Sequence, residues 1–377
     1  MKAFFKRSLQ LSDVLNRKSA FLFGARGTGK TTLIQSQLPE ARVYDLLEEK
    51  TYLKLLQDSS ILDQENQDKR LIVIDEIQKL PKLLDEVQRL IVKKNYRFLL
   101  TGSSARKLKS AGVNLLGGRA LELHLFPLIW NEIPGFQLER FLNHGGLPEV
   151  YQSEKPEDDL KSYLGFYLRE EVSREAFVRR IEHFTKFLDL IAIQNGEELH
   201  FSNLASDTGF KARTIENYIE VLEDTLLGFR LPPFEKTRKR KPITRSKFYL
   251  FDLGVTRLLS KQSEMRNGSI AFGKAFEHFL ILEIRAALRY QRRDIPLAYW
   301  RTKNGYEVDV IIGDETALEI KATSQPTDRH LRGLRALREE GVLKRYRLIC
   351  QVEHPRMIDG IEILPWEHYL RELWDGH

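Results

Sequence analysis

A glycine-rich octapeptide near the start of the chain constrains its fold more than any other feature. Residues 24–31 read Gly-Ala-Arg-Gly-Thr-Gly-Lys-Thr, follow the apolar run 20–23 and precede a helical pattern. A strand, a glycine loop and a helix in this order direct several backbone N–H groups and the positive end of the helix at one place. The arrangement predicts a P-loop, a cradle for the phosphates of a nucleoside triphosphate.

The chemistry of a P-loop assigns roles to its polar side chains. Lys30 would reach the β- and γ-phosphates, and the hydroxyl of Thr31 would ligate Mg²⁺. Lys30 is therefore also a candidate catalytic residue. The residues predicted to contact the nucleotide are Gly24, Arg26, Gly27, Thr28, Gly29, Lys30, Thr31 and Thr32.

An acidic strand supplies the partner that a P-loop needs. Residues 71–76 read Leu-Ile-Val-Ile-Asp-Glu, an apolar run that ends in two carboxylates. Asp75 would hold the metal through water, and Glu76 would polarise the attacking water. Either motif alone could be a chance glycine turn or a chance acidic pair. The two motifs in this order indicate a nucleoside triphosphatase.

Strand and helix signals alternate over residues 1–136, the first predicted domain. The predicted strands cover residues 20–23, 42–45, 71–75, 97–101 and 121–125. The central strands are wholly apolar, which is typical of a parallel sheet covered by helices on both faces. The expected fold class is α/β, with the parallel sheet of a P-loop NTPase at its start.

Two further positions are candidate catalytic residues on weaker signals. The fourth predicted strand ends in small polar residues, which would place the hydroxyl of Ser103 near the γ-phosphate. The alternative for Ser103 is a turn that closes the strand. Arg119 lies in a glycine loop and could stabilise transition-state charge, in cis or across a subunit boundary. The alternative for Arg119 is an ordinary solvated arginine.

Composition indicates a globular protein of two or three domains, with 377 residues, 42% of them hydrophobic and 30% charged. The single cysteine, Cys350, lies in an apolar run and is interpreted as a core residue, which excludes an internal disulfide. No apolar stretch approaches the roughly 18 residues of a membrane span, so we expect no membrane partner and a cytoplasmic location. A net charge of +7 permits a nucleic-acid partner without establishing one.

The middle of the chain divides into two predicted segments. Residues 137–195 read as a helical lid or linker, and residues 196–262 read as a winged helix. In the second segment a short helix, a turn at Gly209 and a longer helix form a helix-turn-helix pattern. The basic run 236–241 would be a phosphate-binding wing or a solvated hairpin. Carboxylates on the second helix favour backbone binding or a protein-facing role over base readout.

Residues 263–377 contain a helix followed by two strand signals. Asp309 lies in the first strand and Glu319 and Lys321 in the second, and the turn between the strands favours a hairpin that brings Asp309 beside Glu319. Such carboxylates would bind Mg²⁺ or Mn²⁺, with Lys321 as a catalytic group that orients a water. Glu277 on the preceding helix could add a metal ligand or a base. The alternative is a structural salt bridge.

Taken together, these residues resemble a group of prokaryotic ATPases that join an AAA-type (STAND-related) ATPase domain to a C-terminal region called DUF4143. The matching motifs lie at residues 24–31, 71–81, 100–104, 117–119, 126–128, 145–149, 273–279 and 306–323. The last two motifs resemble the PD-(D/E)xK nuclease-like core, with Asp309, Glu319 and Lys321 in the motif positions and Glu277 on the preceding helix. The resemblance implies a restriction-endonuclease-like α/β fold for residues 263–377. It also implies ATP as the nucleotide, because the P-loop alone does not separate ATP from GTP.

Three hypotheses about function follow. In the first, the chain is an ATP-driven DNA-processing protein that forms a homo-oligomer such as a ring, and its nuclease-like region cuts or grips DNA. In the second, it is a nucleotide-controlled switch with protein partners and an inactive nuclease-like scaffold. In the third, it remodels one bound protein partner, as chaperones do.

Overall fold

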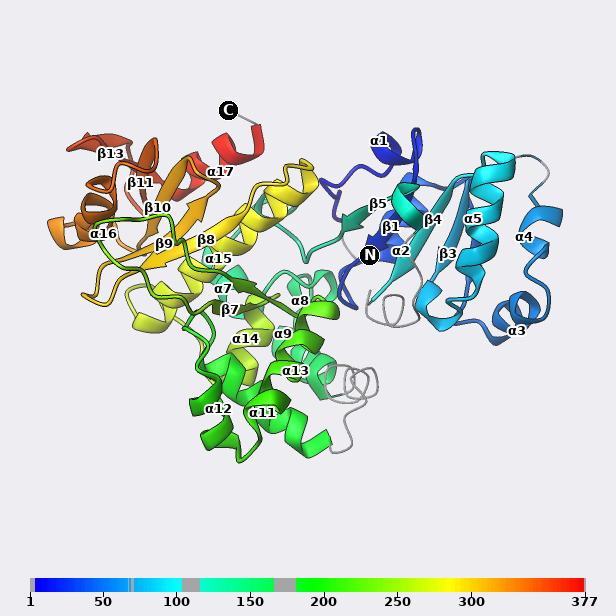
Figure 1. Cartoon of the computed structure of the whole chain (residues 1–377), viewed down its shortest axis with the longest axis horizontal. Helices are drawn as coiled ribbons and strands as arrows, with labels where there is room; N and C mark the ends of the chain where they lie inside the picture. The colour runs from blue at the N-terminus through cyan, green and yellow to red at the C-terminus, as the bar shows by residue number, and fades with distance from the viewer. Residues whose placement is uncertain (1–3, 67, 69–70, 104–115, 166–180, 376–377) are drawn as a thin grey trace.

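The computed structural model describes residues 4–66, 68, 71–103, 116–165 and 181–375. Figure 1 shows an N-terminal unit around one sheet, a mostly helical middle region and a C-terminal unit around a second sheet. The long helix α15 (Ile270–Tyr290) extends from the C-terminal unit toward the N-terminal one.

The N-terminal unit contains a five-stranded, wholly parallel sheet, which confirms the fold class expected there. Its strands are β1 (Ser19–Phe23), β2 (Arg42–Asp45), β3 (Ile72–Asp75), β4 (Phe98–Gly102) and β5 (Ala120–His124). They lie in the order β2-β3-β4-β1-β5. Because β4 lies between β1 and β3, the loops that follow these three strands meet at the carboxyl edge of the sheet.

Both faces of this sheet are buried, which explains why its strands lack polar alternation. Phe21 and Phe23 pack into the core beneath α5 (Leu83–Lys94), whereas Ala20 and Leu22 pack on the opposite face beneath α2 (Lys30–Gln37). The helices and turns of the unit are α1 (Ser12–Leu15), α2 (Lys30–Gln37), α3 (Glu49–Gln57), α4 (Ile61–Gln64), η1 (Ile77–Lys79), α5 (Leu83–Lys94) and η2 (Leu116–Gly118).

The middle region is helical with one two-stranded sheet. Its elements are η3 (Trp130–Glu132), α7 (Leu138–His144), α8 (Pro148–Tyr151), α9 (Pro156–Ser162), α11 (Ile181–Ile193), α12 (Phe201–Thr208), α13 (Ala212–Asp224), β6 (Gly228–Leu231), β7 (Lys247–Leu250) and α14 (Leu253–Leu259). The predicted helix–turn–helix is present in α12 and α13, and Gly209 between them has a φ of 76°. That left-handed conformation favours glycine and ends α12.

The chain between β6 and β7 leaves the middle region and follows the edge of the C-terminal sheet. The amide of Tyr299 donates to the carbonyl of Pro232 at 2.9 Å, and the amide of Phe234 donates to the carbonyl of Tyr299 at 2.6 Å. Farther along, Ile243 donates to the carbonyl of Arg301 at 2.8 Å. The basic run 236–241 therefore lies in a segment that is docked at both ends.

The C-terminal unit contains a six-stranded mixed sheet in the order β12-β13-β11-β10-β9-β8. Its elements after α15 are β8 (Leu297–Arg301), β9 (Glu307–Ile312), β10 (Thr316–Ile320), α16 (Asp328–Arg338), β11 (Arg345–Cys350), β12 (Arg356–Ile358), β13 (Ile361–Pro365) and α17 (Trp366–Asp375). Strands β9 and β10 form the predicted antiparallel hairpin, and α16 crosses over to β11, which is parallel to β10. Cys350 is buried in the core, as predicted.

A β-bulge at Asp309 interrupts the pairing of β8 with β9. Ala298 pairs with Ile311 and Trp300 pairs with Val308, so Asp309 and Val310 together face one residue of β8. Val308 and Val310 consequently pack into different cores, which corrects the simple alternation expected for this strand. Bulges of this kind redirect side chains and are common beside functional sites.

Candidate functional site

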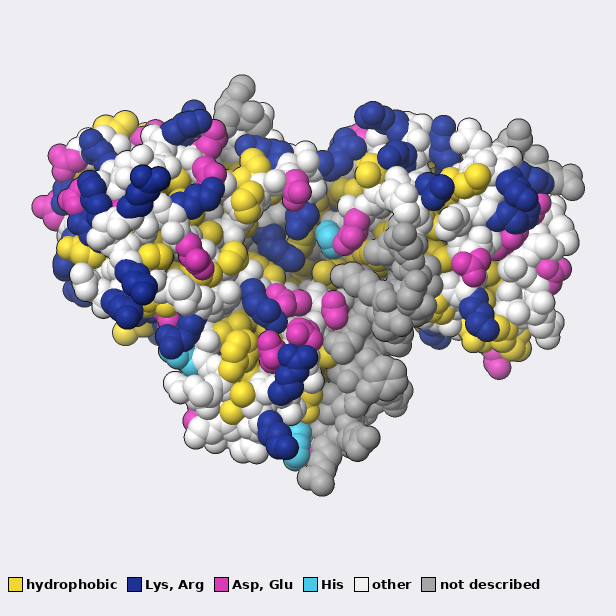
Figure 2. Space-filling model, viewed as in Figure 1, with side chains coloured by type: hydrophobic (Ala, Val, Ile, Leu, Met, Phe, Trp, Pro, Cys, Tyr) yellow, Lys and Arg dark blue, Asp and Glu magenta, His cyan; other side chains and the backbone are white. Residues whose placement is uncertain are grey.

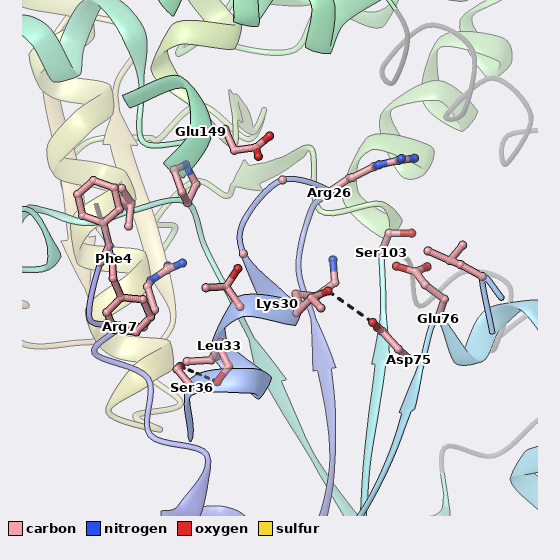
Figure 3. Close-up of a pocket in the computed structure, with 18 of the residues that line it drawn as sticks. Phe4, Arg7, Arg26, Lys30, Leu33, Ser36, Asp75, Glu76, Ser103 and Glu149 are labelled. Atoms are coloured by element: carbon pink, nitrogen blue, oxygen red, sulfur yellow. Dashed lines mark hydrogen bonds between the residues drawn. The ribbon is translucent and has the colours of Figure 1, made fainter. Parts of the chain in front are cut away.

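The P-loop joins β1 to α2 at the carboxyl edge of the N-terminal sheet (Figure 3). Gly27 and Gly29 have φ values of 80° and 91°, and Gly29 directly precedes the first residue of α2, Lys30. A side chain at Gly24 would place its Cβ 2.6 Å from the carbonyl oxygen of Leu125. These three glycines are therefore required by backbone geometry and by close packing. The amine of Lys30 donates to the carbonyl of Gly24 at 2.8 Å.

The two carboxylates of the acidic strand lie beside the P-loop, and Thr101 of β4 contacts the side chain of Asp75 and the backbone of Glu76. The hydroxyl of Thr31 lies 3.5 Å from Oδ2 of Asp75, and the hydroxyl of Thr101 donates to Oδ1 of Asp75. The amide of Glu76 donates to the Thr101 hydroxyl at 3.2 Å, and Glu76 itself has a left-handed φ of 58°. Such a backbone is uncommon for glutamate and is typical of functional sites.

Gln78 connects Glu76 to Ser103. Its Nε2 donates to the hydroxyl of Ser103 at 3.1 Å and also to a carboxylate oxygen of Glu76. A Cβ at Gly102 would lie 2.5 Å from Oε1 of Gln78, so the glycine makes room for this side chain. The sequence motifs indicate neither Gln78 nor Thr101 as site residues. Both are found only when β4 is seen to lie beside β3.

These groups line one cavity of about 810 Å³. The predicted site residues in its lining are Arg26, Gly27, Gly29, Lys30, Thr31, Thr32, Asp75, Glu76 and Ser103. Gly24 and Thr28 lie outside that lining. Thr28 is fully buried, and its hydroxyl donates to the carbonyl of Ala25 at 2.8 Å, which stabilises the shape of the loop. Thr31 and Asp75 present oxygen ligands of the kind that Mg²⁺ prefers.

Arg7 anchors the N-terminal segment under the P-loop. Its guanidinium donates to the carbonyl of Thr28 at 2.7 Å, to that of Phe126 at 2.6 Å and to the carboxylate of Glu132 at 2.8 Å. Arg7 is only 6% exposed, and burial raises the pKa of Glu132. The P-loop, the start of the chain and the segment after β5 are thereby held as one unit.

The middle region supplies the remaining wall of the cavity. Pro148, Glu149 and Gln152, in and next to α8, line it. The loop before α8 is fixed by Asp252, which accepts a hydrogen bond from the amide of Gly146 at 2.8 Å. Burial raises the pKa of Asp252 to about 6. The position of α8 is thus set by contacts within the middle region.

Arg119 does not reach the cavity of its own chain. It precedes β5, whose first residue Ala120 pairs with Ser19 at the amino end of β1, whereas the P-loop follows the carboxyl end of β1. A five-residue strand spans roughly 16 Å, which exceeds the reach of one side chain. The predicted role of Arg119 in cis is therefore wrong. Its role across a subunit boundary stays a prediction.

A second cluster forms in the C-terminal unit, where the structure brings together the four residues predicted from its motifs. The amine of Lys321 lies 3.0 Å from Oδ2 of Asp309 and 2.7 Å from Oε1 of Glu319. The other oxygen of Glu319 is buried and has no hydrogen-bond partner among the described residues. Burial, followed by the charge of Asp309, raises the pKa of both Glu319 and Glu277.

Strand β7 of the middle region inserts a second lysine into this cluster. Lys247 is 4% exposed, and its amine lies 2.6 Å from Oε1 of Glu307 and 3.7 Å from Oε1 of Glu277. The hydroxyl of Tyr249 donates to Glu277 at 2.8 Å. Lys247 and Tyr249 are absent from the sequence predictions, because only the tertiary structure brings β7 beside α15.

The donor chemistry of the second cluster is only partly that of a metal site. Carboxylate oxygens suit Mg²⁺ or Mn²⁺, and one oxygen of Glu319 lacks a partner. However, no three acidic, histidine or cysteine side chains in the described parts of the chain are arranged to hold an ion. A metal at Glu277, Asp309 and Glu319 therefore stays a prediction.

The basic run is engaged by the C-terminal unit. The amides of Arg238 and Lys239 donate to the carboxylate of Glu340 at 2.9 and 2.8 Å. Arg240 forms ion pairs with both Glu339 and Glu340, and Lys236 lies 2.5 Å from Asp314. Part of the positive charge of the run is therefore neutralised within the chain.

Three known domain families match consecutive parts of the chain. Residues 16–134 match the AAA domain, residues 135–266 match a domain of unknown function (DUF8612), and residues 272–369 match a domain of unknown function (DUF4143). The chain carries an AAA domain followed, after the middle region, by a DUF4143 domain. Both were implied by the resemblance of its motifs.

Relatives and solved structures add little about activity. Uncharacterized proteins of Mycobacterium tuberculosis and Mycobacterium bovis are each 26% identical over 297 residues, which is 75% of this chain and 65% of the relative. The chain thus spans slightly less than two thirds of these relatives. A Signal Transduction ATPase with Numerous Domains (STAND) protein with a tetratricopeptide repeat sensor from Pyrococcus horikoshii aligns with a TM-score of 0.25 and 15% identity, over 78% of this chain and 48% of that one. A score this low does not establish a shared overall fold.

Among the residues that the structure describes, no helix is both long and apolar enough to cross a bilayer.

Proposed function

We propose that the chain binds ATP with Mg²⁺ and hydrolyses it to ADP and phosphate. The observation that carries this proposal is the convergence of Lys30, Thr31, Asp75, Glu76 and Ser103 on one cavity at the carboxyl edge of an AAA domain. The residues come from three strand ends that are distant in the sequence. A chance glycine turn would not bring them together.

In the proposed reaction, each residue acts on one part of the nucleotide. The P-loop amides and Lys30 bind the β- and γ-phosphates, and Thr31 and Asp75 would hold Mg²⁺, which neutralises phosphate charge. Glu76 orients a water for attack on the γ-phosphorus and accepts its proton. The bond from the γ-phosphorus to the bridging oxygen breaks, and that oxygen leaves with ADP. Ser103, positioned by Gln78, donates to the γ-phosphate.

We further propose that ATP turnover acts on DNA through the middle and C-terminal regions. Two features support this proposal. Residues Glu198 and Lys247 form an isolated β-bridge, so a single residue before α12 pairs with β7 at the place that the first strand takes in winged helices. In the C-terminal unit, α15, β8, β9, β10, α16 and β11 follow the order of a nuclease-like core, and Asp309, Glu319 and Lys321 lie together on β9 and at the end of β10.

A nucleotide-controlled switch with protein partners is the second candidate. The ion pairs of Arg240 with Glu339 and Glu340 favour it, because they withdraw the basic run from a nucleic-acid partner. Figure 2 shows positive and negative side chains interspersed over the visible face, without a single basic stripe. In this candidate the lysines of the second cluster act as permanent counter-ions, and the C-terminal unit is a scaffold.

One experiment separates the two candidates. ATP turnover is measured with and without duplex and single-stranded DNA, together with Mg²⁺- and Mn²⁺-dependent DNA cleavage, for the parent and Glu319→Ala. DNA-stimulated turnover with cleavage that the variant loses supports DNA processing. Turnover that responds to no nucleic acid, with no cleavage, supports the switch. Glu315→Ala, which removes an exposed carboxylate from the turn between β9 and β10, is the matched control.

A homo-oligomer follows if Arg119 completes the site of a neighbouring copy. Turnover per chain should then rise with protein concentration, and Arg119→Ala should lower it by roughly a factor of 10³ while ATP binding is retained. A monomer in analytical ultracentrifugation with full activity would contradict this role. Arg17→Ala, which removes another exposed arginine of the same unit, provides the control.

A further inference from the structure

Arg285 of α15 lies where the N-terminal, middle and C-terminal units meet. Its guanidinium carbon is 4.9 Å from the ring centroid of Phe126, which follows β5, and 4.3 Å from that of Phe229 on β6. Two aromatic rings from different units therefore fix its position. Neither ring offers an oxygen or nitrogen acceptor to the N–H donors of the guanidinium.

No anion neutralises Arg285 within the part of the chain that the structure describes. Its side chain makes no hydrogen bond or ion pair there, and the carboxylate whose charge acts on it, Glu223, forms an ion pair with Arg230 at 3.2 Å. Burial, followed by the charge of Arg289, lowers the pKa of Arg285 to about 10. A partly buried cation without a counter-ion costs free energy, which an entering anion would recover.

Arg289 adds a second positive charge one turn farther along α15. Its side chain is exposed and likewise has no hydrogen bond or ion pair among the described residues. Like charges four residues apart on a helix repel each other, so the pair opposes helix stability unless an anion screens it. Residues at this spacing have Cβ atoms about 5–6 Å apart, so one extended polyanion can contact both.

The surface between the units is open to a large ligand. Figure 2 shows a hollow between the N-terminal and C-terminal units, in the place that the end of α15 takes in Figure 1. Lys and Arg side chains line this hollow together with apolar ones. A phosphodiester backbone presents a row of single charges to such a surface, and guanidinium groups bind phosphate oxygens in pairs.

We propose that Arg285 and Arg289 form a site for the phosphodiester backbone of DNA at the junction of the three units. Each guanidinium donates paired hydrogen bonds to phosphate oxygens, while Phe126 and Phe229 keep Arg285 oriented for the contact. Such contacts position DNA without reading its bases. This inference rests on the proposed action on DNA and names residues that hold its backbone.

The test measures the fluorescence anisotropy of a labelled DNA duplex bound by the full chain at a series of salt concentrations. Arg285→Met should weaken binding at least about tenfold and make the slope of log affinity against log salt shallower by about 1. Arg289→Met should also have a shallower slope. Arg371→Met, which removes an exposed arginine of α17, is the matched control and should keep the parent's slope.

The melting temperature separates this role from a purely structural one. Methionine fills the space beside the rings without a charge, so Arg285→Met should melt at or above the temperature of the parent. If Arg285 only braces the units through the rings, the variant should melt lower and keep the parent's salt slope, which would overturn the site. If it melted lower and also lost DNA, Arg289→Met would decide, because exposed substitutions change stability little. An unchanged slope in Arg289→Met would then overturn the site.

Competitors identify the anion. At constant ionic strength, inorganic phosphate should displace the duplex no more than chloride does, and poly-glutamate should bind more weakly than the duplex. Stronger displacement by phosphate would assign the site to a small anion, and tighter binding of poly-glutamate would assign it to an acidic protein, so either result would overturn the DNA assignment. A parent that bound no DNA would remove the proposed action on DNA as well, whereas the proposed ATP hydrolysis would stand.

Discussion

At the scale of single residues, neutral side chains decide where the two carboxylates of the proposed reaction lie. Thr101 donates to Asp75 and accepts from the amide of Glu76, and Gln78 ties Glu76 to Ser103. Asp75 and Glu76 are therefore both positioned by uncharged neighbours. Such preorganisation lowers the cost of aligning the reacting groups.

Removal of the P-loop amine should abolish the reaction. Lys30→Ala is expected to lower ATP affinity or turnover at least about a hundredfold, because no other donor replaces the lysine on the phosphates. Isothermal titration and phosphate release measure the two effects. Lys50→Ala, an exposed lysine of α3, should change neither. Unchanged turnover in Lys30→Ala would remove the P-loop assignment.

Glu76→Gln should separate binding from hydrolysis. The amide keeps the size of the side chain but cannot accept a proton from water, so turnover should fall roughly 10²- to 10⁴-fold while ATP stays bound. Filter binding with radiolabelled ATP and single-turnover kinetics measure both quantities. Glu49→Gln at the start of α3 is the control. Rapid hydrolysis by Glu76→Gln would mean that another residue positions the water.

At the scale of elements, α15 connects all three units. Glu277, in the first half of α15, belongs to the second cluster. Nε2 of the next residue, His278, lies 2.7 Å from the carbonyl oxygen of Leu250 in the middle region. Glu283 accepts from the amide of Trp130 at 2.7 Å, and the Tyr290 hydroxyl accepts from Phe126 at 3.1 Å. A single helix therefore carries contacts from the second cluster to the segment that follows β5.

The buried carboxyl of Glu283 should make stability depend on pH. Burial raises its pKa to about 8, above the ordinary value of 4.5 that the unfolded chain retains. The native state then binds more protons than the unfolded state, so stability is fully present below about pH 4.5 and is lost as pH rises through 8. Between pH 6 and 8 the loss from this group should be about 2 kcal/mol.

The variant Glu283→Gln tests this prediction, because its side chain cannot ionise but still accepts a hydrogen bond from the amide of Trp130. Denaturant midpoints at pH 6 and pH 8 should differ less in this variant than in the parent. Glu367→Gln, an exposed carboxylate of α17, should leave the pH dependence as in the parent. Equal pH dependence in the parent and in Glu283→Gln would show that the carboxyl is already ionised in the native protein.

At the scale of the whole molecule, the middle and C-terminal units are joined by backbone hydrogen bonds and by ion pairs of Lys247. The segment 232–243 bonds to Tyr299 and Arg301 at the edge of the C-terminal sheet, and Lys247 enters the second cluster. The AAA domain meets this pair through the contacts of Arg7 with Tyr290 and through α8 at the nucleotide cavity.

Lys247→Met should lower the free energy of unfolding by disrupting the contact between the middle and C-terminal units. It leaves Glu307 and Glu277 without their buried cation, and breaking a buried ion pair in this way costs about 3–5 kcal/mol. Chemical denaturation followed by tryptophan fluorescence measures the loss. Lys344→Met, which breaks an exposed pair with Glu315, should cost at most about 1 kcal/mol. A Lys247→Met variant as stable as the parent would mean that the cluster is already neutralised by protons.

The sequence by itself determined the five parallel strands, the P-loop, the acidic pair and the hairpin that joins Asp309 to Glu319. These are local in the chain: glycine positions, apolar runs and strand alternation specify them without reference to distant residues. For the same reason the sequence predicted which motif residues belong to a site, but it did not predict which residues from other elements contact them.

Only the tertiary structure decided which residues support and complete these sites. Arg7 and Lys247 carry no sequence signal, because each meets its partners through packing between elements far apart in the chain. Arg119 follows the 100–104 motif in sequence, yet it lies at the opposite edge of the sheet from the P-loop. Nearness in sequence therefore did not predict its position. Long-range packing decides such positions, because the contacts that hold each residue form only when separate elements assemble.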